Sequence, residues 1–159
     1  MYEKILLPLD GSEVGEAAMV FIKDLLTKLS KEVSVEVTLL HVLSPASQSF
    51  SIHDESFDAY FQKEDYERVK TKFLEYLNAA GEGPRIAGIK VNVRVEYGDI
   101  PTQIAKVAEE MDADMIAMSS HGHTGIGLSP MGSIAYKALQ LDTDIPIIIV
   151  RPPKYKLKQ

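Results

Sequence analysis

Five short apolar runs alternate with segments of helical spacing along this chain of 159 residues. The runs, rich in isoleucine, leucine and valine, occupy residues 5–9, 33–42, 89–95, 115–118 and 145–150. Between them, apolar residues recur three or four positions apart, which predicts amphipathic helices. Regular alternation of strand and helix is typical of a parallel sheet with helices on both faces. Because there is neither an internal repeat nor a linker, the sequence predicts one doubly wound α/β domain.

Local signals indicate where the first two helices begin and end. The first helix has an apolar face whose members are three or four residues apart: Val14, Ala18, Phe21, Leu25 and Leu29. Asp10 or Ser12 has the side-chain oxygen needed to cap this helix. The second helix covers residues 66–80 and is expected to end at residues that favour termination: Gly81, Gly83 and Pro84. The polar stretch at 44–54 before it is interpreted as a loop.

Composition excludes several classes of function. The chain has no cysteine, so disulfides, thiolate metal sites and cysteine nucleophiles are excluded. Its formal net charge of −6 disfavours a role in binding nucleic acid. No apolar run approaches the roughly 20 residues that span a bilayer, and no secretory signal is recognisable in residues 1–5. We therefore expect a cytoplasmic protein that neither enters a membrane nor binds nucleic acid.

Two strands have the character of sheet edges. Residues 89–95 alternate apolar and polar side chains, as a half-exposed strand does. The last strand contains Pro146, which donates no backbone hydrogen bond and so favours a strand start or an edge. An apolar edge is prone to aggregate unless it is paired, so residues 147–150 predict a homodimer formed through this strand. The domain is expected to cover residues 1–153, followed by a basic C-terminal tail at 154–159.

The segment after the fourth strand, residues 119–133, is the most informative part of the chain. It reads SSHGHTGIGLSPMGS. Glycines let backbone amides approach a phosphate closely, and Gly132 and Ser133 open a helix whose first amides lack partners. One interpretation is an anion cradle built from amides, and the other is a loop in which Ser133 only caps the helix. The segment matches neither the Walker A pattern nor G-x-G-x-x-G.

The spacing within this segment resembles the universal stress protein signature, G-x2-G-x9-G-[S/T]. Its four positions correspond to Ser119, Gly122, Gly132 and Ser133, with serine in place of the first glycine. Further segments resemble the family in the same order along the chain: residues 5–12, 40–42, 98–101, 114–122 and 146–151. The resemblance covers nearly the whole chain. It implies a five-stranded parallel sheet of order 3-2-1-4-5 with helices on both faces.

The resemblance also implies that the chain binds an adenine nucleotide, ATP or AMP, at the carboxyl edge of the sheet. Asp10 and the backbone of Val42 would hold the adenosine, with Met118 close to the nucleoside. The phosphates would be lined by residues of the glycine-rich segment: Ser119, Gly122, His123, Gly132 and Ser133. The segment contains no lysine or arginine. A triphosphate would therefore rely on amides, hydroxyls and Mg²⁺.

Two functions follow from this reading. The first is a regulatory module that changes shape or partners with its nucleotide state. Slow ATP hydrolysis is the most catalysis expected, because no nucleophile, base and orienting group are recognisable together. The alternative is a dimeric stress protein that binds no nucleotide. Gly122, Gly132 and Ser133 argue against this alternative, whereas Ser119 favours it.

Two other classes of site fit the residues less well. A phosphoacceptor receiver domain needs an acidic pair after the first strand, where only Asp10 stands. His121 and His123 alternate as metal ligands can, but no carboxylate or cysteine nearby would complete a coordination shell. We therefore expect no resident metal at these histidines.

Overall fold

The computed structural model describes residues 3–28, 34–44, 63–122 and 131–153. The elements run in the order β1 (Lys4–Pro8), α1 (Ala17–Lys28), β2 (Glu36–Leu43), α3 (Lys63–Ile86), β3 (Lys90–Tyr97), α4 (Ile100–Glu110), β4 (Met115–Ser119), α5 (Ser133–Ala138) and β5 (Ile147–Val150). All the strand pairs are parallel, in the order β3-β2-β1-β4-β5. The predicted fold and strand order are confirmed, as are the two predicted edge strands. The tail at 154–159 and most of the loop predicted at 44–54 lie outside the described residues.

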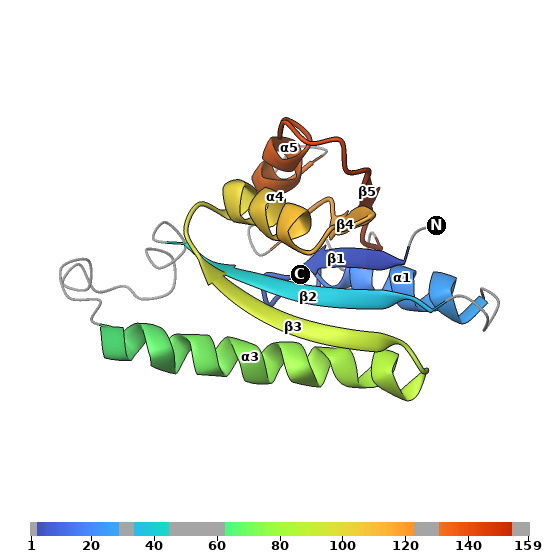
Figure 1. Ribbon diagram of the computed structural model, residues 1–159, viewed down its shortest axis with the longest axis horizontal. Helices are drawn as coiled ribbons and strands as arrows, with labels where there is room; N and C mark the ends of the chain where they lie inside the picture. Colours follow the sequence, from blue (N-terminus) through green and yellow to red (C-terminus); the bar gives the residue numbers. More distant parts are fainter. Residues whose placement is uncertain (1–2, 29–33, 45–62, 123–130, 154–159) are drawn as a thin grey trace.

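Helices cover both faces of the sheet (Figure 1). Because side chains alternate along a strand, β1 buries Ile5 and Leu7 toward one face and Leu6 toward the other. The first face packs against α1 and α3, with Ala18, Ile22 and Leu77 buried. The second packs against α4, whose buried residues are Ile104, Val107 and Ala108. A strand buried on both faces must be apolar throughout, which explains the continuous run at residues 5–9.

The helix α3 is longer than the sequence suggested. It continues to Ile86 through the residues that were expected to end it: Gly81, Gly83 and Pro84. That expected end is therefore wrong. A Cβ on Gly81 would lie 2.9 Å from Cγ1 of Val91 in β3. Gly81 thus serves the close packing of α3 on the sheet rather than termination.

The helix α3 is terminated two residues after Ile86 by Gly88, whose φ of +87° lies in the left-handed region. The N–H of Gly88 donates to the carbonyl of Arg85 at 2.9 Å, and the N–H of Ile89 donates to that of Pro84 at 3.1 Å. These two bonds are those of a Schellman motif, which satisfies carbonyls left over at a helix end.

The helix α1 packs Ala18 and Leu25 on the core as expected, but it buries Ile22 in place of Phe21. Ala18 and Ile22 are buried, whereas Phe21 is 43% exposed, so the placement of Phe21 on the inner face is wrong. Successive helical residues are separated by about 100° of rotation. A spacing of three or four residues therefore fits either Phe21 or Ile22 after Ala18, and contact with the sheet selects Ile22.

Among the described residues, no helix combines the length and apolar character that crossing a bilayer requires.

Candidate functional site

The carboxyl ends of β1, β2 and β4 lie side by side at one edge of the sheet. The chain runs outward from β1 through β2 to β3 and then returns to form β4 on the other side of β1. A reversal of this kind leaves a crevice outside the strand ends. The turn after β1, the end of β2 and the segment after β4 therefore meet at this edge.

Asp10 begins the turn that follows β1. Its Oδ1 accepts hydrogen bonds from the N–H of Ser12 at 3.0 Å and from its hydroxyl at 2.6 Å. Ser12 Oγ accepts the N–H of Gly15 at 2.9 Å, and its carbonyl accepts that of Glu16 at 3.2 Å. These are the bonds of an N-cap residue. They close the turn at residues 13–16, and α1 begins only at Ala17, so Ser12 caps this turn rather than the helix itself, and Asp10 orients Ser12.

Two glycines enclose the Asp10 carboxylate. A Cβ on Gly15 would overlap Oδ1, and a Cβ on Gly122 would overlap Oδ2. Gly15 belongs to the turn after β1 and Gly122 to the segment after β4, so the carboxylate lies where the two meet. A larger residue at either position would displace the carboxylate. The structure thus brings together Asp10, expected near the adenosine, and Gly122, expected near the phosphates.

The segment after β4 is closed at its base by Gly132. The N–H of Gly132 donates to the carbonyl of Ser120 at 2.6 Å, and a Cβ on Gly132 would lie 3.0 Å from that oxygen. Ser120 is only 2% exposed, and its N–H donates to the carbonyl of Val150 in β5 at 2.8 Å. Gly122 and Gly132 therefore lie close together, near the two ends of the segment after β4. His123, expected beside a phosphate, lies outside the described residues.

Gly132 is also the N-cap residue of α5, with φ −68° and ψ 155°. Ser133 is the first helical residue and is exposed, so the interpretation in which Ser133 caps the helix is wrong. The N–H of Tyr136 donates to the carbonyl of Gly132 at 3.0 Å. The amides of α5 before Tyr136 have no acceptor within the helix and are directed outside it.

Ser119 and Met118 end β4, and both are buried. The Ser119 hydroxyl donates to the carbonyl of Val14 at 2.8 Å, which ties β4 to the turn leading into α1. Met118 packs against Ala135 and Ala138 of α5. The Ser119 hydroxyl is thus engaged with the protein backbone, and the Met118 side chain is part of the core that packs against α5.

The end of β2 reaches beyond the end of β1. The N–H of Leu9 donates to the carbonyl of Leu40 at 2.8 Å, so the main-chain groups of Leu40 point toward β1. Main-chain groups alternate in direction along a strand. Those of Val42 therefore point the same way, past the last β1 residue, Pro8. The Val42 side chain packs against α4, so Val42 is core through its side chain and faces the crevice through its backbone.

Sequence reasoning missed a row of aromatic rings in contact on the α3 side of this edge, formed by His41, Phe73 and Tyr76. His41 Nδ1–H donates to the carbonyl of Leu9 at 2.7 Å, and its ring stacks on Phe73 with centroids 3.5 Å apart. Burial lowers the pKa of His41, against the opposing effects of the Leu9 carbonyl and Asp10. Phe73 meets Tyr76 edge-on at 6.4 Å. The neutral Nδ1–H tautomer is the form that serves Leu9, because a carbonyl only accepts.

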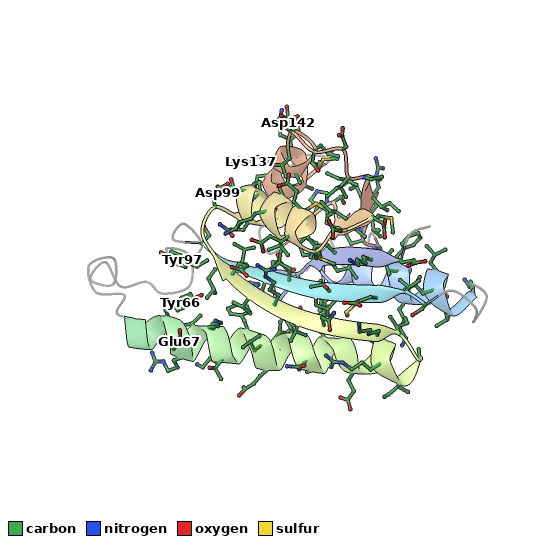
Figure 2. The ribbon with its side chains drawn as sticks, viewed as in Figure 1. Tyr66, Glu67, Tyr97, Asp99, Lys137 and Asp142 are labelled. Atoms are coloured by element: carbon green, nitrogen blue, oxygen red, sulfur yellow. The ribbon has the colours of Figure 1, made fainter. Side chains whose placement is uncertain are left out.

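A second aromatic pair anchors the outer part of the edge. Tyr66 of α3 lies against Tyr97 at the end of β3, with ring centroids 5.6 Å apart (Figure 2). Beyond Tyr97, Asp99 caps α4, since its Oδ2 accepts the N–H of Thr102 at 3.2 Å and the Thr102 hydroxyl at 2.6 Å. The bonds from Thr102 lower the pKa of Asp99. These contacts fix the strand ends on the side away from β4.

Comparison with known proteins agrees with this architecture. The family model described as the universal stress protein family matches residues 1–151. The universal stress protein YxiE of Bacillus subtilis is 28% identical over 156 residues, which cover 95% of this chain and 100% of that protein. The solved structure of MJ0577, from Methanocaldococcus jannaschii, has a TM-score of 0.75 and 24% identity, covering 97% of this chain and 99% of the other.

A solved universal stress protein family protein from Arabidopsis thaliana, with AMP bound, is also similar in structure. Its TM-score is 0.63 and its identity 15%, covering 97% of this chain and 94% of the other. At these identities the two solved structures establish the fold.

Proposed function

The chain belongs to the universal stress protein family, and on this premise we propose that it is a stress-response protein regulated by an adenine nucleotide, ATP or AMP. The nucleotide would lie at the carboxyl edge of the sheet. The observation that carries the proposal is the junction at Asp10, where Gly15 and Gly122 leave no room for a side chain. The Arabidopsis relative with AMP bound supports the choice of ligand.

The chemistry of each group supports a division of the site. Asp10 is an acceptor and suits ribose hydroxyls, while its charge would repel a phosphate. The backbone of Val42 offers a donor and an acceptor beyond the end of β1, which suits the polar edge of adenine. The phosphates would lie against the backbone of Gly122, Gly132 and Ser133, with the amide of Ser133 as a donor, because the N–H of Gly132 already donates to the Ser120 carbonyl. Met118 would support the nucleoside from beneath.

The remaining phosphate contacts are His123 and Ser119. His123 stays a prediction. The Ser119 hydroxyl already donates to the carbonyl of Val14, so Ser119 would contribute mainly through its backbone.

The charge of the site favours a nucleotide with few phosphates, or a triphosphate accompanied by a bound cation. The segment 119–133 contains no lysine or arginine to balance a triphosphate. Mg²⁺ in proteins is commonly held by one or two carboxylates together with substrate phosphates, and Asp10 supplies a carboxylate at the junction. Among the described residues no group of three or more histidine and acidic side chains could hold a metal. Mg²⁺ would therefore accompany ATP, whereas AMP, with a single phosphate, requires less compensation of its negative charge.

We also propose that two copies pair through β5. The carbonyls of Pro146 and Val150 accept bonds from β4, so Ile147 and Ile149 direct their main-chain groups away from the sheet. The opposite edge, β3, carries charged residues that discourage pairing: Lys90, Arg94 and Glu96. The apolar β5 edge is thus the better surface for a second copy.

In this proposal the protein acts in the cytoplasm, hydrolyses ATP at most slowly, and changes shape or partners with its nucleotide. The domain would cover residues 1–153, with a separate tail at 154–159.

Identification of the bound nucleotide tests the proposal. The protein is purified without added nucleotide and denatured, and released molecules are identified by chromatography and mass spectrometry. The emptied protein is then titrated calorimetrically with Mg-ATP, ADP and AMP. We expect binding near micromolar affinity, roughly −8 kcal/mol, and its loss in Gly132→Val, because a side chain there meets the Ser120 carbonyl. No release and no binding at millimolar nucleotide would instead favour a dimeric interaction module without a nucleotide.

A further inference from the structure

The backbone on both sides of Asp10 is held from α3 and β2. Before it, the Leu9 carbonyl accepts the Nδ1–H of His41, whose ring stacks on Phe73 of α3. After it, Gly11 has a φ of +86°, and a Cβ built on Gly11 would lie 3.6 Å from Cε1 of Phe73. Phe73 thus lies beside the turn and also supports the histidine that holds the residue before Asp10.

Tyr76 completes this support from the next turn of α3. Its hydroxyl donates to Glu16 Oε1 at 2.8 Å, and Glu16 closes the capped turn by donating its N–H to the Ser12 carbonyl. Burial and the neighbouring Glu16 raise the pKa of Tyr76. The phenol therefore stays protonated near neutral pH and remains a donor to Glu16. This half-buried side chain therefore holds the end of the turn at Glu16.

We propose that Tyr76 is a positioning residue for the nucleotide site, holding the turn after β1 so that Asp10 presents its carboxylate to the ribose hydroxyls. This inference rests on the proposed function. Tyr76 itself touches no part of the nucleotide. Its effect passes through Glu16 and Ser12 to Asp10, and so it concerns the ribose hydroxyls rather than the base or the phosphate.

The test compares Tyr76→Phe with the wild type for two ligands, AMP and its 2′,3′-dideoxy analogue. The phenylalanine ring can keep the edge-on contact with Phe73, so the fold is retained. Loss of one hydrogen bond to a charged group corresponds to about a tenfold change in an equilibrium. We expect AMP affinity to fall by about that factor and affinity for the dideoxy analogue to stay unchanged. Tyr97→Phe removes a hydroxyl from the same edge and is expected to change neither.

A second arm measures the turn without nucleotide. Amide exchange of Gly11 and Ser12, followed by NMR, is expected to accelerate in Tyr76→Phe and not in Tyr97→Phe. Asp10→Asn should lower the preference for AMP over the dideoxy analogue as Tyr76→Phe does. The double variant should lose no more, because both changes act on one interaction.

The outcomes separate the two ideas. If the wild type binds neither ligand, the proposed function fails, and the role of Tyr76 falls with it. If the wild type binds AMP but Tyr76→Phe weakens both ligands equally, or neither, Tyr76 has only a structural role and the inference alone is wrong. Unchanged exchange at Gly11 and Ser12 would also overturn it.

Discussion

Asp10 and Gly122 touch across the junction between the turn after β1 and the segment after β4, with no space for a Cβ between them. Gly122→Ala must therefore displace the carboxylate or the loop. We expect AMP affinity to fall at least about tenfold, with an overpacking cost to stability of about 1–3 kcal/mol. Calorimetric titration and urea unfolding measure the two effects separately.

The matched control for this change is Gly83→Ala. A Cβ on Gly83 would meet only the end of the Lys23 side chain, at 3.4 Å. Alanine is the better helix former by about 1 kcal/mol, so this variant should be no less stable than the wild type and should bind AMP normally. If Gly122→Ala also binds AMP normally, the junction is not part of the nucleotide site.

Ser12 caps the turn that leads into α1 and links it to Asp10, so its removal should affect both stability and binding. Ser12→Ala loses the acceptor for the Gly15 N–H and the hydroxyl that donates to Asp10. Loss of an N-cap costs about 1 kcal/mol, and we expect urea unfolding to show a cost of that order with weaker AMP binding. Ser12→Thr keeps a hydroxyl and should recover both properties. A threonine variant as impaired as the alanine variant would contradict this account.

His41 makes stability depend on pH in a defined direction. Burial lowers its pKa in the folded state below the ordinary value of 6.5. The unfolded chain therefore binds the proton more readily, and the free energy of unfolding decreases as pH falls below about 6.5. For one proton, the slope is at most about 1.4 kcal/mol per pH unit. Urea unfolding at pH 7.5, 6.5 and 5.5 measures this slope.

His41→Gln serves as the control, because the amide can still donate to Leu9 but does not titrate. The carboxylates with lowered pKa values, among them Asp99 and Asp114, lose their contribution at lower pH, below their ordinary value of 3.8. The range from 5.5 to 7.5 therefore excludes these carboxylates, and the comparison with His41→Gln separates His41 from the other three histidines of the chain. An equal slope in wild type and His41→Gln would show that another group titrates.

The strands and the family signature were predictable because their information is local. A strand buried on both faces needs a continuous apolar run, and the run ending at Leu9 shows it directly. The spacing of Ser119, Gly122, Gly132 and Ser133 also lies within one segment. The edge position of β3 followed from its alternating pattern, since only one face of an edge strand must be apolar along its length.

What the sequence did not reveal depends on contacts between distant segments. In the sequence Gly81 is typical of a helix end. Its close approach to Val91 of β3 shows that it serves packing, and the left-handed φ of Gly88 identifies the residue that terminates the helix. Ser119 was expected among the residues that line the phosphates, but its hydroxyl donates to the carbonyl of Val14 in a different loop. No local pattern relates Tyr76 to Glu16, because only the packing of α3 on the turn brings them together.

The proposed dimer gives a prediction that depends on which residues of β5 direct their main-chain groups outward. The main-chain groups of Ile149 point away from β4, since the carbonyl of Val150 points toward it. Ile149→Pro therefore removes a donor from the outer edge and leaves the β4–β5 hydrogen bonds in place, as proline permits at an edge. We expect the wild type to be a dimer and Ile149→Pro a folded monomer by analytical ultracentrifugation, with Ile149→Val still dimeric. A proline variant that remains dimeric would move the interface away from β5, and a monomeric wild type at tens of micromolar would remove the dimer from the proposal.

Because the Asp10 junction lies at the carboxyl edge and not along β5, loss of the dimer should leave AMP affinity unchanged, which separates pairing from nucleotide binding.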